Sequence, residues 1–336
     1  MTTEGGVIKE SNKTVPFEEI YEVIKELGRR PFQPMGCTSF VAACLERGTK
    51  YRFAVKIYQK RIASLDPPRE VAVLLKLKHE NIIRIKEVFE SQLSLSVVME
   101  LNSGEELFRR LQNVSEYSEQ LIAGYFRQIV EAIRFLHEYG IVHKNLKPEN
   151  ILLDSLQPDA IVKITDANID KFLLHDMDIE LVCCNVIYCA PELLLSRKFD
   201  KTFDLWSLGI ILHIMLCGSD PYYPKLDSDL YRSILNGQIE YTSTAWNMIS
   251  WNGKDAVKRL LVLNPPQRAL TTEILKHPWV TGEQARATHL EQIKLNMKQF
   301  NIRRAGANAK FGERQYNRPY LPASRLRCSR KPAHLP

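Results

Sequence analysis

The sequence predicts an α+β protein of two lobes, in which a strand-rich first part is followed by a helix-rich second part. The chain has 336 residues, of which 45% are hydrophobic and 25% are charged, and this is ordinary for a protein with two separate cores. Apolar and polar residues alternate over residues 21–28, and residues 95–101 also have strand character. Beyond residue 102 the apolar residues recur at helical spacing.

The strand-rich part begins after residues 1–16, which are polar and are expected to be disordered. The first strand, over residues 21–28, ends at Gly28. Another strand is expected in the run that ends at Lys56, and a helix with regularly spaced apolar residues is expected around Glu70. These elements would form the first lobe.

The helix-rich part begins with a helix that is expected to open at residue 103, followed by a longer helix over residues 117–139. Residues 205–217 form the most apolar stretch of the chain. Because this stretch is too short to cross a bilayer and is interrupted by His213, it predicts a buried helix. The N-terminus has no basic region followed by an apolar run, so neither a signal peptide nor membrane insertion is expected.

Cysteines and charges bear on location and partners. Seven cysteines at irregular spacing favour reduced thiols, so we expect a cytoplasmic protein, with the nucleus as a further location. The net charge of +7 comes from the C-terminus, because nine Lys and Arg residues and a single Glu follow residue 302. Such a tail is typical of segments that bind calmodulin, nucleic acid or an anionic surface, and equally of solvated disordered tails. Among these partners we expect calmodulin rather than nucleic acid.

Residues 143–150, His-Lys-Asn-Leu-Lys-Pro-Glu-Asn, resemble the catalytic loop of eukaryotic protein kinases, which reads His-Arg-Asp-Leu-Lys-Pro-Glu-Asn. The runs Tyr-Cys-Ala-Pro-Glu at residues 188–192 and His-Pro-Trp-Val-Thr-Gly at residues 277–282 are similar to those of calcium/calmodulin-dependent protein kinases, nearest to type IV. The similarity covers about residues 21–304. It implies the bilobal eukaryotic protein kinase fold, with a β-rich N-lobe and an α-rich C-lobe.

The resemblance also implies how the chain is divided after the disordered residues 1–16. The kinase-like domain covers residues 17–280, with an N-lobe at about residues 17–101 and a C-lobe at about residues 102–280. Residues 281–304 correspond to an autoinhibitory-like regulatory helix, and residues 305–336 to a basic tail that is expected to be disordered.

By the same resemblance, the chain has sites for ATP and Mg²⁺. Lys56 matches the lysine that contacts the α- and β-phosphates, and Glu70 matches the helix glutamate that pairs with it. Asn150 and Asp166 match the metal-binding residues, and Lys147 matches the residue that neutralises the transferring phosphate. The remaining positions that match nucleotide contacts are Gly28, Gly36, Val41, Ala54, Met99, Glu100, Leu101 and Leu152.

Residues 30–35 interrupt the glycine-rich hairpin that covers the phosphates in the family. This insertion contains two prolines, which fix backbone torsions and remove amide donors. A stiffened tip would cover phosphates poorly. Alternatively, the insertion bulges into solvent and the hairpin still closes.

Several features of the family scaffold are kept. The resemblance implies that Glu192 pairs with Arg268 and that Asp204 anchors the catalytic loop. Glu106 and Glu149 match acidic positions that receive a substrate arginine in kinases that prefer basic peptides, although each could equally be a solvated surface residue.

The catalytic motifs depart from the family pattern. Asn145 stands where the family has the aspartate that acts as general base, and the loss of such a base costs about 10²–10⁴ in rate. Ala167 replaces the phenylalanine of the Asp-Phe-Gly motif and is expected to leave a cavity beside Ile85 and His143. Leu181 replaces the threonine that accepts an activating phosphate in the family.

A kept scaffold with altered catalytic residues favours a pseudokinase that binds nucleotide and acts as a scaffold or regulator with impaired phosphotransfer. The alternative is an active or weakly active calcium/calmodulin-regulated kinase that transfers the ATP γ-phosphate to protein serine or threonine. That alternative is reasonable because loose phosphoryl-transfer transition states need little help from a base.

The C-terminal segment has the character of an amphipathic helix. Apolar residues at Leu290, Ile293, Met297 and Phe300 have the spacing of a helix that docks on the C-lobe. By resemblance, calmodulin would bind through about residues 290–316. Two glycines beyond residue 304 each weaken a helix by about 1 kcal/mol relative to alanine, so a disordered tail is the other interpretation.

Overall fold

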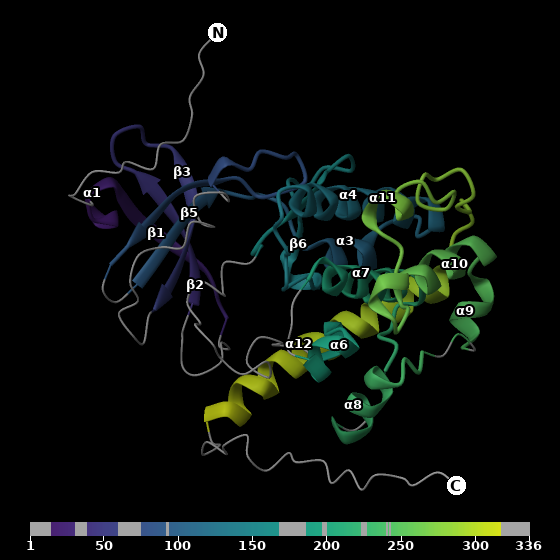
Figure 1. Cartoon of the computed structure of the whole chain (residues 1–336). Helices are drawn as coiled ribbons and strands as arrows, with labels where there is room; N and C mark the ends of the chain where they lie inside the picture. The colour runs from purple at the N-terminus through teal and green to yellow at the C-terminus, as the bar shows by residue number, and fades with distance from the viewer. Residues whose placement is uncertain are drawn as a thin grey trace, which may run out of the picture.

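Two lobes of different secondary structure make up the molecule, as Figure 1 shows. The computed structural model describes residues 15–30, 39–59, 75–91, 94–167, 186–196, 200–222, 227–239, 241 and 243–316. The first lobe is an antiparallel sheet and the second is mostly helical. The predicted α+β bilobal fold is therefore confirmed.

The first lobe is a five-stranded sheet with the order β1-β2-β3-β5-β4. Its strands are β1 (Tyr21–Arg30), β2 (Ser39–Glu46), β3 (Arg52–Gln59), β4 (Ile85–Glu90) and β5 (Ser94–Glu100). A short helix, α1 (Phe17–Ile20), precedes β1, and Phe17 stacks on Tyr21 with 5.4 Å between ring centroids. The strands predicted around residues 21–28, 56 and 95–101 are all present.

The central strand β3 has two buried faces with different neighbours. Val55 packs on one face with Tyr21 and Cys44, in a small cluster under α1. Ala54 and Tyr58 face the other way and belong to the main hydrophobic cluster, which continues into the second lobe. Because side chains alternate along a strand, Lys56 shares this second face, which is the face directed toward the C-lobe.

In its described residues, the second lobe consists of helices and one small hairpin. The hairpin pairs β6 (Ile151–Leu153) with β7 (Val162–Ile164). Short 3-10 turns lie at Pro148–Asn150, Val186–Tyr188 and Pro265–Gln267. The helices are α3 (Leu107–Asn113), α4 (Glu119–Glu138), α6 (Pro191–Ser196), α7 (Lys201–Cys217), α8 (Asp227–Leu235), α9 (Thr244–Met248), α10 (Trp251–Leu260), α11 (Thr271–Ile274) and α12 (Glu291–Tyr316).

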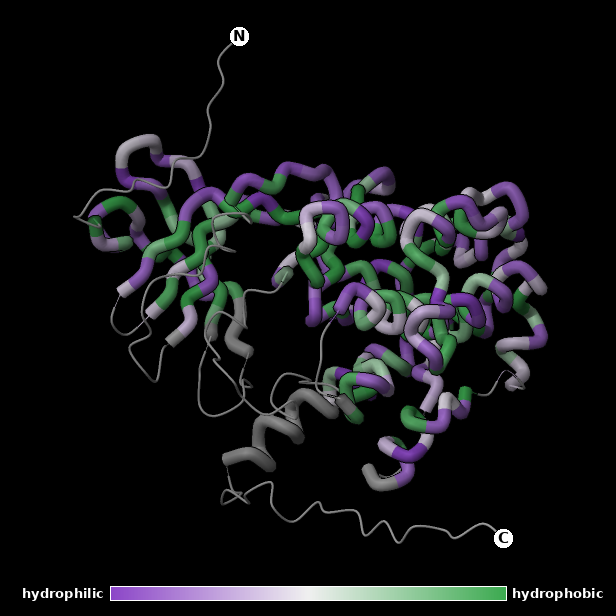
Figure 2. The backbone as a smooth tube through the Cα atoms, in the orientation of Figure 1, coloured by the Kyte–Doolittle hydropathy of each residue, from purple (hydrophilic) through white to green (hydrophobic). Residues whose placement is uncertain are grey.

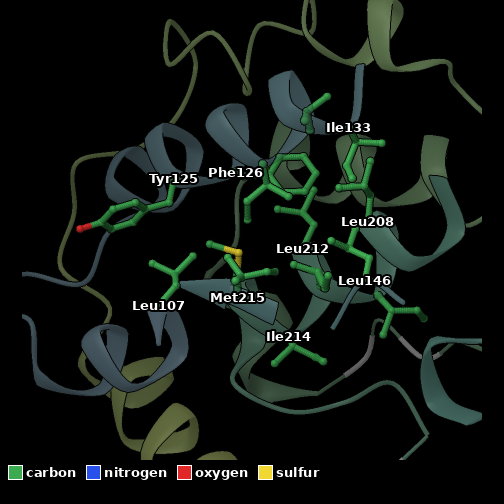
Figure 3. Packing of buried hydrophobic residues seen from close by; sticks show 14 of the residues in the cluster. Leu107, Tyr125, Phe126, Ile133, Leu146, Leu208, Leu212, Ile214 and Met215 are labelled. Atoms are coloured by element: carbon green, nitrogen blue, oxygen red, sulfur yellow. The ribbon is translucent and has the colours of Figure 1, made fainter. Parts of the chain in front are cut away.

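Helices α4 and α7 form the centre of this lobe. Figure 3 shows Phe126 and Ile133 of α4 beside Leu208 and Leu212 of α7, all four completely buried. Figure 2 shows hydrophobic segments toward the middle of the helical lobe and hydrophilic residues around its rim. The apolar stretch at residues 205–217 is buried along its whole length, as predicted. No helix among the described residues is long and apolar enough to span a membrane.

The prediction that a helix opens at residue 103 is wrong, because α3 begins only at Leu107. The preceding residues run alongside the β6–β7 hairpin, where Leu153 N donates to Glu105 O over 2.8 Å and Glu106 forms a bridge with Leu152. At Gly104 an added Cβ would lie 1.9 Å from Leu153 O. The chain therefore stays extended until it has passed the hairpin.

The C-terminal helix also differs from its predicted bounds of 281–304, since α12 runs from Glu291 to Tyr316. Its start is fixed where Leu290 N donates to Tyr117 O over 2.7 Å. Its C-terminal part contradicts the expected disordered tail over residues 305–316. Helix formation is cooperative, so a helix that is already docked can continue through two glycines that each weaken it by about 1 kcal/mol relative to alanine.

The cysteines only partly follow the prediction of reduced thiols. Cys44 and Cys217 are free and buried, whereas Cys189 is disulfide-bonded.

Candidate active site

The loop at residues 143–150 is fixed from below by a buried carboxylate. Asp204, at the start of α7, is fully buried and accepts hydrogen bonds from the backbone N–H groups of His143 at 2.8 Å and Lys144 at 2.9 Å. His137 on α4 donates to the same carboxylate at 2.8 Å. The anchoring role expected for Asp204 thus has a direct structural basis.

Electrostatics keep this anchor charged and the neighbouring histidine neutral. Burial would raise the pKa of Asp204, but hydrogen bonds from the His137 side chain and the Lys144 backbone lower it overall. Burial lowers the pKa of His143, despite the opposing attraction of Asp204 and Asp166. A neutral His143 can donate from Nε2 to Thr165 O at 3.1 Å and accept from Asn145 N at 3.2 Å. His143 therefore links the loop to β7.

The β6–β7 hairpin brings Asn150 and Asp166 to the same end of one small sheet. Ile151 pairs with Ile164, and Thr165 N donates to Asn150 O over 3.0 Å. Asn150 is fully buried and its side-chain nitrogen donates to Asn145 O over 2.7 Å. These contacts hold the amide of Asn150 in one orientation, next to the chain that carries Asp166.

Lys56 reaches across from the sheet to Asp166. The two side chains form an ion pair in which they are 5% and 3% exposed, so water hardly screens it. Tyr58 donates a hydrogen bond to the same oxygen, Asp166 Oδ1, over 3.2 Å. Glu70, the partner that the resemblance implies for Lys56, lies outside the described residues.

A small cavity lies beside Ala167, as the replacement of phenylalanine at this position predicts. It has a volume of about 20 Å³, room for about one water molecule. Apart from Asp166 and Thr165, its lining is apolar: Leu77, Ile82, Ile83, Ile85, Met99, Ile164 and Ala167.

The residues predicted to contact nucleotide lie around this centre where the structure describes them. Val41 is opposite both Gly28 and Lys56 in the sheet, and Ala54 is opposite Met99. After β5, the chain enters the C-lobe through Glu100 and Leu101, and Asn102 donates to Leu153 O over 2.7 Å. Leu152 lies on β6 below this connection. Gly36 and the tip of the inserted hairpin lie outside the described residues.

Glu106 and Glu149 lie together and both face Arg304 of α12. Arg304 forms an ion pair with Glu106, and its Nη1 lies 3.5 Å from Glu149 Oε1. Burial would lower the pKa of Arg304, but the two carboxylates raise it overall. Phe108 and Phe300 flank the guanidinium, with ring centroids 6.0 and 5.8 Å from it. The acidic pair expected to receive a substrate arginine is thus in contact with an arginine of the chain itself.

Glu192 and Arg268 form the ion pair that the resemblance implies. The contact is bidentate, with distances of 2.5 and 2.7 Å, and Arg268 Nη1 also donates to Thr202 O at 2.9 Å. This pair ties α6, which follows the segment of residues 168–185, to the base of the lobe. That segment itself, with Asn168 and Leu181, lies outside the described residues.

Asn150 and Asp166 are the side chains that could hold a divalent cation here. Both offer hard oxygen donors of the kind that Mg²⁺ prefers. Within the described part of the chain, no three His, Cys, Asp or Glu side chains gather closely enough to hold a metal ion. The donor set therefore fits Mg²⁺ that shares phosphate oxygens with a nucleotide rather than a cation held by protein alone.

Sequence reasoning missed two features of this site. Tyr58 was not singled out, although its position two residues after Lys56 places both on one face of a strand. Arg304 was recognised only as part of a basic segment. Its pairing with Glu106 bridges 198 positions of sequence and has no local signal.

Comparison with known proteins gives a consistent result. A model of the protein kinase domain matches residues 21–280. Calcium/calmodulin-dependent protein kinase type IV of Rattus norvegicus is 41% identical over 296 residues, which are 88% of this chain and 61% of that protein. The type IV kinase of Homo sapiens is 41% identical over 287 residues, 85% of this chain and 59% of that protein.

A third relative differs in length. Myosin light chain kinase A of Dictyostelium discoideum is 35% identical over 298 residues, 88% of this chain and 98% of that protein. The chain thus spans about three-fifths of the length of the type IV relatives, of which 61% and 59% are covered.

Proposed function

Because the chain belongs to the protein kinase family, we propose that it binds ATP and Mg²⁺ around Lys56 and Asp166 and transfers the γ-phosphoryl group slowly to serine or threonine of proteins. The observation that carries this proposal is the assembly of Lys56, Asn150 and Asp166 on an intact scaffold. The names of the relatives, all kinases, support it.

Each residue would have a defined part in this reaction. Lys56 would leave Asp166 and contact phosphate oxygens, while Asn150 and Asp166 would hold Mg²⁺. Bound Mg²⁺ supplies neutralisation of the phosphate charge. Lys147, half-buried in the same loop, would face the transferring group. Positioning and charge neutralisation account for most of the catalysis of phosphoryl transfer.

Asn145 is the reason for proposing slow transfer. Its amide oxygen can accept a hydrogen bond from a hydroxyl and so orient it, but an amide does not take up the proton. Loss of a general base costs about 10²–10⁴ in rate, and the remaining groups still provide orientation.

A second candidate function is the pseudokinase, a nucleotide-binding scaffold or regulator without transfer. Two observations favour it. Asn145 cannot serve as a base, and the cavity beside Ala167 leaves Asp166 without the packing that a larger neighbour would provide. This candidate and the first share the nucleotide site and differ only in whether a phosphoryl group is transferred.

Helix α12 would regulate access for a basic peptide. With Arg304 on Glu106 and Glu149, a substrate arginine has no place at this acidic pair. We propose that calmodulin binds through about residues 290–316 and displaces α12 from Glu106 and Glu149. The printed name of the type IV relatives, which includes calmodulin dependence, supports this part of the proposal.

The deciding experiment is transfer of radiolabelled γ-phosphate to a basic serine peptide, with calcium and calmodulin present. The full chain is compared with Asn145→Asp and Lys56→Met. We expect the full chain to transfer phosphate slowly. The transfer rate should rise by about 10²–10⁴ in Asn145→Asp, and Lys56→Met should transfer no phosphate. If neither the full chain nor Asn145→Asp transfers phosphate while ATP still binds, the pseudokinase is the correct function.

A further inference from the structure

Tyr58 contacts both charged groups at the centre of the candidate site. It lies two residues after Lys56 on β3, so the two side chains leave the same face of the sheet. Its side chain is completely buried. The hydroxyl donates to Asp166 Oδ1 over 3.2 Å, and Lys56 Nζ lies 4.6 Å from the centre of the ring.

Asp166 depends on such partners for its orientation. Its backbone has φ of 71°, in the left-handed region that residues other than glycine adopt only when their surroundings hold them there. The next side chain, Ala167, is small and borders the cavity of about 20 Å³, so it cannot wedge the backbone in place. Polar contacts to the carboxylate from Lys56 and Tyr58 contribute to holding Asp166 there.

Lys56 and Tyr58, the donors to Asp166 Oδ1 among the described residues, differ in what happens when a cation approaches. Lys56 is positively charged, so a divalent cation at the carboxylate repels its ammonium group. The hydroxyl of Tyr58 is neutral, and a carboxylate oxygen has lone pairs for both a hydrogen bond and a metal. The hydrogen bond from Tyr58 is therefore compatible with a bound cation.

We propose that Tyr58 is a positioning residue that holds the Asp166 carboxylate in the orientation required for Mg²⁺, taking over part of the role that packing of a larger residue at position 167 would have. The inference rests on the proposed nucleotide site. It predicts that loss of the hydroxyl weakens ATP binding in the presence of Mg²⁺ much more than ATP binding in its absence.

The test is calorimetric titration of the full chain and of Tyr58→Phe with ATP, with and without Mg²⁺. Phenylalanine keeps the ring and removes only the donor. We expect the affinity with Mg²⁺ to fall about tenfold, equivalent to about 1.4 kcal/mol. The affinity without Mg²⁺ should change by less than about twofold.

Tyr117→Phe is the matched control. Tyr117 is also completely buried, and its hydroxyl donates to Met215 O over 2.6 Å, in the interior of the helical lobe. This variant should lower the melting temperature without changing the effect of Mg²⁺ on ATP affinity. A merely structural role for Tyr58 would produce the same pattern as this control.

Two outcomes of the titration overturn the proposal: equal losses with and without Mg²⁺, or tighter binding of Mg²⁺ and ATP by Tyr58→Phe. If the unmodified chain binds no ATP at all, the proposed function fails separately. A double-mutant cycle of Tyr58→Phe and Asp166→Asn then measures, from free energies of unfolding, whether the two side chains interact. Additive effects in that cycle also overturn the proposal, whereas coupling supports the orientation of Asp166 by Tyr58.

Discussion

His213 is a buried histidine near the end of α7 whose surroundings keep it neutral. Its Nδ1 donates to Ser219 O over 3.2 Å, and its ring packs on Trp246 with 4.8 Å between centroids. Burial lowers its pKa to about 3, although the hydrogen bond to Ser219 opposes this change. In the unfolded chain a histidine has a pKa of about 6.5. Below that value the unfolded state binds a proton that the folded state does not.

The free energy of unfolding should therefore decrease as the pH falls from about 6.5 toward 3, by about 1.4 kcal/mol per pH unit from His213 alone. His213→Asn should remove this contribution while keeping a donor for Ser219. Urea unfolding at pH 7.5, 6 and 5 measures how the free energy of unfolding changes with pH in the unmodified chain and in His213→Asn. His79 and His143, whose pKa values are also lowered, remain in both proteins. Identical slopes for the two proteins would contradict the prediction.

Several single residues could be assigned from the sequence because their motifs are local and specific. Asp204, Glu192 and Arg268 have the contacts that the resemblance implied. The cavity beside Ala167 followed from the size of the replaced side chain. The partner of Arg304 could not be found in this way, since its contact with Glu106 depends on where a distant helix docks.

At the scale of elements, the docking of α12 depends on Gly218. Gly218 ends α7 with φ of 71° and lies directly under α12. A Cβ at this position would lie 2.5 Å from Asn296 Cβ and 2.7 Å from Met297 N. Because one of these neighbours is backbone, the helix itself would have to move.

Gly218→Ala should therefore displace α12 from the C-lobe. Gly140→Ala is the matched control, because Gly140 has φ of 70° but nothing within 4 Å of its added Cβ. The control should lose only about 1–2 kcal/mol from backbone strain. Hydrogen exchange of the α12 amides distinguishes the two variants. We expect faster exchange in Gly218→Ala alone, and equal protection in both would contradict the docking described here.

Strands and long helices were predicted well because their periodicity is strong. The two errors in helix bounds have tertiary causes. Residues before Leu107 pair with the β6–β7 hairpin, and α12 extends beyond residue 304 from a docked segment in which Ile293 and Met297 are fully buried. Neither cause can be seen in the local sequence, where propensity alone favoured an earlier helix at one place and disorder at the other.

At the scale of the whole molecule, the candidate site exists only because the two lobes meet. Lys56 and Tyr58 come from the sheet, whereas Asp166 comes from the hairpin of the helical lobe. The resemblance identified Lys56 and Asp166 separately. It could not predict that they contact each other in this state. The two residues are 110 positions apart in the sequence, so their contact depends on how the lobes pack together.

The central claim is that this interlobe site binds ATP together with Mg²⁺. The most direct measurement is a thermal-shift titration of the full chain with ATP, with and without Mg²⁺, beside Asp166→Ala. A ligand at 100 times its dissociation constant stabilises the folded state by about 2.7 kcal/mol. We predict a rise in melting temperature that requires Mg²⁺ and is absent in Asp166→Ala. No rise at millimolar ATP, or an equal rise in Asp166→Ala, would contradict the account.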